Sequence, residues 1–387
     1  MIIIVDKNIP FAEKAFHSLG EVKGIDTADF KAENIRGADV LIVRSETKVN
    51  GALLDGNRVK FIGTPTSGTD HLDIPYLNSQ EIIHANAPGC NANSVKEYVV
   101  AALLNLARVN GFSLKGKTIG VIGVGNIGSK IVKAADALGM AVLQNDPPLA
   151  RTTGDKKFHP LDRVLHADII TLHVPLTKTG PDATFHLFNR DRIGRMNPGV
   201  IFINTSRGAV VDSVALKEAI AEKRIAATVI DVWENEPHFD SDLLPLITIA
   251  TPHIAGYSIE GKMNAVWMVR ETFCRFFAIE APWDPLDEIG FTGDTEIHPT
   301  AEKLPAEEVL HRIVKSAYDI ALDDEQLRRL SSLPPDQFAR EFMKLRTGYG
   351  VRREFSNWTV FLPPAHAAVE GVIRELDFKI DYSSRLI

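Results

Sequence analysis

Short runs of apolar residues alternate along the chain with segments whose apolar residues recur at helical spacing. The apolar runs lie at 2–6, 39–43, 59–65, 117–123, 140–146, 167–175, 199–206 and 226–233. Strands this uniformly apolar are buried on both faces, which is typical of a parallel sheet covered by helices. The alternation therefore predicts an α/β fold built from doubly wound parallel sheets.

Two long helices are predicted at 94–108 and 259–277, where apolar residues follow a helical period. A glycine-rich turn comes soon after the first helix, so we expect 94–256 to form one complete nucleotide-binding domain. Residues 1–93 are predicted to form a separate α/β domain.

The pattern changes after about residue 280. A linker is expected at 281–300, and helical stretches rich in charge follow at 307–330. We therefore predict that 281–387 is a third, smaller domain.

Composition narrows the class of protein. With 387 residues the chain is too long for one core, and its net charge of −7 disfavours nucleic acid as a partner. Its two cysteines are too few for a disulfide framework. There is neither a signal-peptide pattern at the start nor an uncharged apolar run long enough to cross a membrane. We expect a soluble, cytoplasmic protein.

A dinucleotide fingerprint follows the predicted strand at 117–123. Gly123, Gly125 and Gly128 form G-x-G-x-x-G, and Asp146 ends the next strand. Such glycines allow a tight turn, close approach of the backbone to a pyrophosphate, and close packing of helix on strand. Asp146 can bind both ribose hydroxyls and would repel a 2′-phosphate, so NAD is preferred over NADP. The alternative is a glycine turn that binds nothing.

Four more polar residues follow predicted strands, where α/β sheets bind ligands. These are Arg207, Asp231, Glu236 and His253. Each alone would be an ordinary surface or loop residue. Together behind a dinucleotide site they suit oxidation of a 2-hydroxy acid: a histidine takes the hydroxyl proton, a carboxylate orients it, and an arginine binds the substrate carboxylate.

The chain resembles the D-isomer-specific 2-hydroxyacid dehydrogenases. The likeness rests on motifs in family order: GVIGVGNIGSK, HVPLT, MNPGVIFINTSRGAVVD, DVWENEP and TPHIAG. It implies that Arg207, Glu236 and His253 are catalytic, that NAD is the cofactor and that no metal is needed. Besides the fingerprint glycines and Asp146, the implied cofactor contacts are Asn126, Ile127, Pro175, Thr205, Ser206, Asp231 and Gly256.

The resemblance also implies how the domains are built. Residues 1–93 would be completed by about 257–280 to form a substrate-binding domain. The two long helices would then act as a hinge, with the active site in the cleft between the domains.

Within the family, the loops resemble those of the branch that oxidises 4-phospho-D-erythronate in vitamin B6 biosynthesis. This implies substrate contacts at Ser45, Thr66 and Tyr257. The segment 345–357 resembles part of that branch's C-terminal dimerisation domain, which implies a homodimer.

The residues alone do not decide which side chains would bind the phosphate of the substrate. Arg44 and the hydroxyls around Thr66 could form a phosphate cradle, or they could be ordinary turn residues. Three arginines of the C-terminal domain are an alternative that we otherwise read as surface charges: Arg346, Arg352 and Arg353.

Two other functions compete with this one. A sister dehydrogenase acting on 3-phosphoglycerate would also need to hold a carboxylate and a phosphate. An NAD-sensing binding protein without turnover could keep the same catalytic residues.

Overall fold

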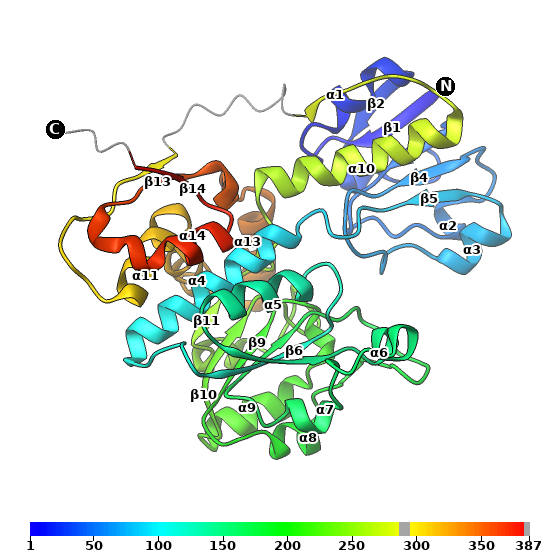
Figure 1. The fold of residues 1–387 in the computed structure, drawn as a ribbon. Coiled ribbons are helices and arrows are strands. Elements are labelled where there is room, and N and C mark those ends of the chain that lie inside the picture. Colours follow the sequence, from blue (N-terminus) through cyan, green and yellow to red (C-terminus); the bar gives the residue numbers. More distant parts are fainter. Residues whose placement is uncertain (286–294, 383–387) are drawn as a thin grey trace. The chain divides into compact units, whose positions relative to one another are not determined.

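The computed structural model describes residues 1–285 and 295–382, which divide into two compact units. The first unit contains Met1–Asn91 and 258–285, and the second contains Ala92–Tyr257 and 295–382. Figure 1 colours the chain by residue number, so the return of the yellow-green helix to the blue strands can be followed there. Part of the linker expected at 281–300 lies outside the described residues.

The first unit is built on a five-stranded parallel sheet in the order β2-β1-β3-β4-β5. Its strands are β1 (Ile2–Asp6), β2 (Glu21–Ile25), β3 (Val40–Ile42), β4 (Phe61–Gly63) and β5 (Ile83–Ala85). Its helices are α1 (Ala12–Phe16), α2 (Gly51–Leu54), α3 (Ile74–Ser79) and α10 (Ile259–Phe277).

Both faces of this sheet are covered by helices. Neighbouring residues of a strand point to opposite faces, so they belong to two different cores. Ile3 and Val5 pack in one core with α1 and α10, whereas Ile4 packs in a second core with α2 and α3. At the end of β4, a side chain on Gly63 would collide with Val269 of α10, since a Cβ there would lie 2.5 Å from Val269 Cγ1. The helix therefore packs directly on the strand.

The second unit contains a six-stranded parallel sheet in the order β11-β10-β9-β8-β6-β7. Its strands are β6 (Thr118–Ile122), β7 (Ala141–Asn145), β8 (Ile169–Leu172), β9 (Val200–Asn204), β10 (Ile225–Ile230) and β11 (Ile249–Ala250). The chain passes from β7 across β6 to β8, so the strand order reverses between β6 and β8. Ligands bind at such switch points, beyond the carboxyl ends of the strands.

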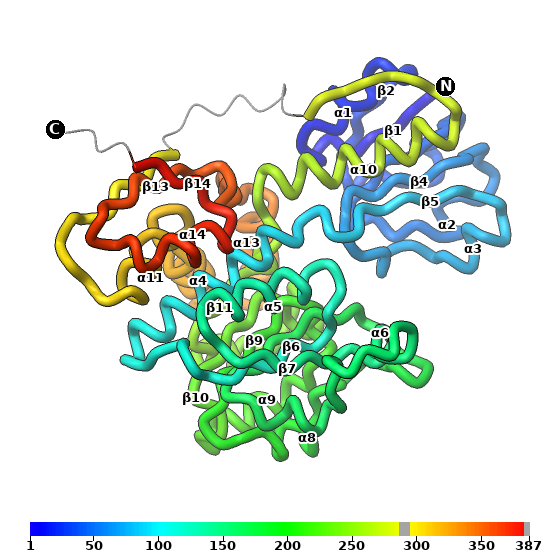
Figure 2. The backbone as a smooth tube through the Cα atoms, in the orientation of Figure 1, coloured from blue at the N-terminus to red at the C-terminus, as the bar shows by residue number. Residues whose placement is uncertain are grey.

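Helices cover both faces of the second sheet, as the backbone trace in Figure 2 shows. One core is shared with α4 (Ala92–Asn110) and α5 (Gly128–Ala137). The opposite core is shared with α7 (Leu161–Val164), α8 (Arg190–Arg195), α9 (Ser213–Ala221) and α13 (Pro335–Thr347). The short helix α6 (Pro147–Thr153) follows β7.

The C-terminal part of the second unit adds a small parallel sheet of β12 (Glu296–Ile297), β13 (Thr359–Phe361) and β14 (Lys379–Asp381). Three further helices accompany it: α11 (Ala306–Ala317), α12 (Ile320–Arg328) and α14 (Glu370–Glu375). Helix α11 packs on α4. Short 3-10 turns are found at His17–Leu19, Thr27–Asp29, Gly208–Val210, Ser241–Leu246, Phe355–Asn357 and Pro364–Val369.

The predicted fold class is confirmed, with two doubly wound parallel sheets and a smaller C-terminal α+β region. Helix α10 spans the residues predicted for it. The edge strands β2 and β5 were not predicted. Most of their side chains are exposed or half-buried, so they carry no continuous apolar run.

None of the described helices is both long and apolar enough to span a membrane.

A buried polar network joins the C-terminal segment to α4. The Arg352 guanidinium donates to the Ser94 carbonyl at 2.6 Å and lies 3.8 Å from Glu97 Oε2. Its guanidinium carbon lies over the Tyr318 ring, 3.8 Å from the ring centroid, and Glu97 accepts the Phe355 N–H at 2.8 Å. Arg352 is only 5% exposed, so the reading of this residue as a surface charge was wrong. Its hydrogen-bond partner Ser94 lies 258 residues away along the chain, so the contact could not be seen in the sequence.

This network makes stability depend on pH. Burial raises the pKa of Glu97 from 4.5 to about 8, against the opposing effects of Lys96 and Arg352. The unfolded chain loses this proton near pH 4.5 and the folded chain near pH 8, so stability should fall as pH rises between them. Glu97→Gln keeps the acceptor for Phe355 and should flatten that part of the Tm–pH curve. Parallel curves for wild type and variant, by calorimetry from pH 5 to 9, would contradict this account.

Candidate active site

The glycine turn between β6 and α5 has the geometry of a dinucleotide site. Gly123 has a φ of +84°, and a Cβ there would lie 2.4 Å from the His173 carbonyl oxygen. A Cβ on Gly128 would lie 1.9 Å from the Gly123 carbonyl oxygen, so only glycine fits either position. A Cβ on Gly125 would meet no atom within 4 Å. The turn is therefore closed on its protein side and open at Gly125, where a pyrophosphate needs access.

Asp146 connects the end of β7 to this turn. One carboxylate oxygen accepts the N–H of Val124 at 2.8 Å, inside the glycine turn. The other accepts the N–H of Leu149 at 3.0 Å and so caps α6. The residue remains partly exposed, beside the exposed Gly125 and Asn126, while Ile127 precedes α5. The structure thus brings the fingerprint and its acidic residue together.

His173 lies on the other side of the switch point, just after β8. Its ring nitrogens are hydrogen-bonded to the hydroxyls of Thr171 at 2.9 Å and Thr205 at 3.3 Å. Burial lowers the pKa of His173 to about 3, so the ring is neutral at physiological pH. Pro175 follows it in the HVPLT motif. The sequence pointed to Pro175 and Thr205 but missed this histidine, although it belongs to the same motif.

Arg207 follows β9 in a tightly held turn. The buried Asn204 side chain donates to the Arg207 carbonyl at 3.0 Å and accepts the Ser206 N–H at 3.0 Å. Gly208 comes next, and a Cβ there would lie 2.0 Å from the Trp233 carbonyl carbon. The Arg207 turn therefore packs backbone to backbone on the loop that leads to Glu236. Asn204 and Gly208 were both missed, because neither stands out until the two loops are seen together.

His253 and Glu236 form a direct pair. The Nδ1 atom of His253 is hydrogen-bonded to the Glu236 carboxylate, whose second oxygen accepts the Trp233 N–H at 3.1 Å. Burial raises the pKa of Glu236, but the charge and hydrogen bond of His253, helped by Arg346 and the Trp233 N–H, outweigh it and leave the pKa lowered. Glu236 is therefore a carboxylate at neutral pH. The Nε2 atom of the ring lies on the side away from this pair.

The loop that carries His253 is fixed by the buried carboxylate of Asp231. Its oxygens accept the Thr251 hydroxyl at 2.7 Å and the N–H groups of Ile254 and Ala255 at 2.8 and 3.0 Å. The Thr251 hydroxyl is also hydrogen-bonded to Tyr98 of α4 at 2.7 Å. The His253 N–H donates to the Asp231 carbonyl at 2.7 Å. Thr251 and Tyr98 were not singled out from sequence.

Arg352 holds the same loop from the C-terminal segment. Its guanidinium donates to the Ala255 carbonyl at 3.2 Å, directly before Gly256 and Tyr257. The Tyr257 hydroxyl accepts a hydrogen bond from Arg346 of α13 at 3.4 Å, and its ring meets Tyr349 edge-on at 5.9 Å.

The other predicted substrate residues belong to the first unit, whereas Tyr257 belongs to the second. Ser45 lies just beyond β3, and its hydroxyl donates to Glu46 at 3.3 Å. Thr66 lies just beyond β4, and its hydroxyl donates to the Gly68 carbonyl at 2.7 Å. Both follow strands at the carboxyl edge of their sheet, where a ligand would approach.

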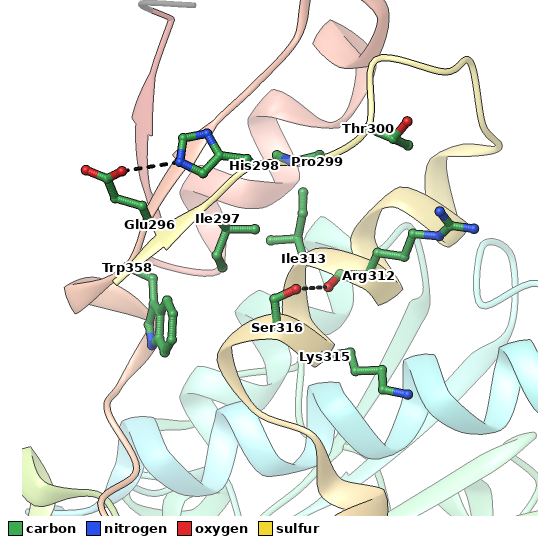
Figure 3. A pocket seen from close by; sticks show the side chains of 10 residues that line it. All are labelled: Glu296, Ile297, His298, Pro299, Thr300, Arg312, Ile313, Lys315, Ser316 and Trp358. Carbon is green, nitrogen blue, oxygen red and sulfur yellow. Dashed lines mark hydrogen bonds and ion pairs between the residues drawn. The ribbon is translucent and has the colours of Figure 1, made fainter. Parts of the chain in front are cut away.

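A cavity of about 560 Å³ lies in the C-terminal region, between β12 and α11 (Figure 3). Its charged residues already have partners: His298 with Glu296 at 3.2 Å, Arg312 with Glu308 at 2.6 Å and Lys315 with Asp319 at 3.5 Å. None of the predicted site residues lines it. Within 1–285 and 295–382 no group of histidine, cysteine and acidic side chains is arranged to hold a metal ion.

Similar proteins include NAD-binding dehydrogenases, as the glycine turn predicts. Residues 91–255 match the family described as the NAD-binding domain of D-isomer specific 2-hydroxyacid dehydrogenases, and 296–370 match a domain of unknown function. The D-lactate dehydrogenase of Aquifex aeolicus, solved with NAD and lactic acid, has a TM-score of 0.61 and 28% identity, over 75% of this chain and 97% of its own. The NAD-bound 3-phosphoglycerate dehydrogenase of Entamoeba histolytica has a TM-score of 0.62 and 27% identity, over 72% and 95%.

Full-length relatives are more similar still. The erythronate-4-phosphate dehydrogenase of Salinibacter ruber is 45% identical over 97% of this chain and 99% of its own. That of Escherichia fergusonii is 42% identical over 95% and 96%. The family predicted from the motifs and its NAD cofactor are confirmed. The chain belongs to the erythronate-4-phosphate dehydrogenases, within the D-isomer specific 2-hydroxyacid dehydrogenase family.

Proposed function

We propose that this chain oxidises 4-phospho-D-erythronate to 2-oxo-3-hydroxy-4-phosphobutanoate with NAD, in pyridoxal phosphate biosynthesis. The observation that carries the proposal is the His253–Glu236 pair, positioned in the same unit as the glycine turn and Arg207. The names of the full-length relatives supply the substrate.

NAD would supply the hydride acceptor when bound. The open face at Gly125 and the partly exposed Asp146 fit its pyrophosphate and adenosine ribose. Further contacts are proposed for the residues that follow the neighbouring strands: Gly123, Asn126, Ile127, Gly128, Pro175, Thr205, Ser206, Asp231 and Gly256. Asp231 already holds the His253 loop, so part of its contribution to this site is to fix that loop.

His253 would remove the proton of the substrate's 2-hydroxyl through Nε2. Glu236 holds Nδ1, which fixes the orientation of the ring and stabilises its protonated form. Arg207 would bind the substrate carboxylate with its planar guanidinium and so align C2 for reaction. Ser45, Thr66 and Tyr257 would contact the rest of the substrate.

Two further features of the protein are proposed with this function. The C-terminal region would form a homodimer, which a monomeric mass by light scattering would disprove. The enzyme would work in the cytoplasm, in keeping with the low cysteine content of the chain.

A substrate panel tests the function directly. We expect kcat/KM for 4-phospho-D-erythronate to exceed that for 3-phosphoglycerate, and NAD to be preferred over NADP because Asp146 repels a 2′-phosphate. A higher kcat/KM for 3-phosphoglycerate would instead identify the sister dehydrogenase. If no hydroxy acid reduces NAD although NAD binds, the chain would be an NAD-sensing protein.

The catalytic pair predicts a loss of turnover without a loss of cofactor binding. Glu236→Gln replaces the carboxylate that is hydrogen-bonded to Nδ1 and orients the ring, so kcat should fall while the Kd of NAD stays unchanged. His253→Ala removes the base itself and should lower kcat by about 10²- to 10⁴-fold with little change in the Kd of NAD. An unchanged kcat in Glu236→Gln would argue against the pairing.

A further inference from the structure

Arg346 extends from the C-terminal region to the candidate active site. It lies in the last turn of α13, and its guanidinium donates to the Tyr257 hydroxyl at 3.4 Å. A second contact, at 3.7 Å, goes to the sulfur of Met343. Arg346 also acts electrostatically on Glu236. All these residues belong to the second unit, so the cation and the catalytic pair share one compact body.

The arginines of this segment differ in what they contact. Arg352 is almost fully buried and holds backbone carbonyls of α4 and of the His253 loop. Arg353 donates to Asn357 at 2.8 Å, within the C-terminal region. Arg346 is partly exposed and adjoins Tyr257. Among these three arginines, Arg346 is therefore the one in a position to meet a substrate.

The proposed substrate has two anionic groups, and each is best bound by a cationic side chain. The substrate carries a carboxylate and a phosphate, and Arg207 would bind the carboxylate. The contacts proposed for the remainder are the hydroxyls of Ser45, Thr66 and Tyr257, which are neutral. A phosphate dianion is bound more strongly by a guanidinium, which offers two parallel N–H donors and a full charge.

The aligned structural relatives do not cover the whole of this chain. This supports a role for the C-terminal region beyond the hydride transfer that the family shares. The Aquifex D-lactate dehydrogenase aligns over 97% of its own length but only 75% of this chain. Its substrate, lactic acid, has a carboxylate and a hydroxyl but no phosphate. Residues 296–370, which include Arg346, match a separate domain. The Entamoeba 3-phosphoglycerate dehydrogenase also aligns over only 72% of this chain, so a phosphate contact from that domain would be particular to this branch of the family.

We propose that Arg346 is a substrate-binding, specificity-determining residue whose guanidinium, together with the Tyr257 hydroxyl, binds the phosphate of the substrate. The proposal rests on the proposed function. It means that the C-terminal region contributes directly to the active site.

Arg44 is the main competing cation. It follows β3 in the first unit and forms an ion pair with Glu46 at 3.3 Å. Lys262 of α10 lies near enough for Arg44 to help lower its pKa, although burial has the larger effect. We favour Arg346 because it contacts the Tyr257 hydroxyl and belongs to the same unit as His253 and Glu236, and the experiment includes Arg44.

The test compares Arg346→Met with Arg340→Met, a control at an exposed arginine of the same helix. Four quantities are measured: kcat and KM for 4-phospho-D-erythronate, the inhibition constant of inorganic phosphate, and the Kd of NAD. Arg346→Met should raise KM about 30-fold or more and weaken phosphate inhibition in parallel. NAD affinity should be unchanged, and Arg340→Met should match wild type. Arg346→Lys should recover part of the loss, which excludes misfolding as the cause.

Three results would overturn the proposal. An unchanged KM with a shifted pH profile of kcat would mean that Arg346 acts through Glu236. A large rise in KM for Arg44→Met, without one for Arg346→Met, would place the phosphate at Arg44. If Arg346→Met lowered kcat/KM equally for D-erythronate and for 4-phospho-D-erythronate, Arg346 would not recognise the phosphate. Failure of wild type to oxidise 4-phospho-D-erythronate is a separate outcome that refutes the proposed function itself.

Discussion

The geometry of the candidate active site depends on one buried carboxylate. Asp231 accepts a hydroxyl and two backbone N–H groups from the loop 251–255. Within that loop His253 has a φ of 58°, a left-handed conformation that a residue with a side chain adopts at a cost of about 1–3 kcal/mol. Hydrogen bonds to an ionised acceptor are stronger than neutral ones and can offset this cost. The conformation in turn directs the imidazole to Glu236.

The same loop is held from a distant part of the chain. Arg352 donates to the Ala255 carbonyl, and Thr251 reaches the Tyr98 hydroxyl on α4. Helix α4 also supplies Ser94 and Glu97 to Arg352. The C-terminal region therefore supports the loop that carries His253, and the proposed phosphate contact at Arg346 would extend this support to the substrate.

Much of this site could be predicted because its chemistry follows apolar strands in the sequence. The glycine turn and Asp146 lie at strand ends, and Glu236 and His253 lie in the loops that follow strands. A parallel sheet brings such ends to one edge. What could not be predicted depends on long-range packing. Gly208 is recognisable only from its contact with Trp233, and Arg352 could not be told from a surface arginine. The edge strands were missed because exposed strands lack the apolar pattern.

Hydrogen exchange in Asp231→Asn tests most directly whether this carboxylate fixes the loop. Asparagine has nearly the same shape but lacks the charge and one of the two acceptors. We expect the amides of Ile254 and Ala255 to lose protection while amides in β9 keep theirs, and kcat to fall with the lost protection. Full protection of both amides in the variant would contradict the account, because the loop would then be held by something other than Asp231.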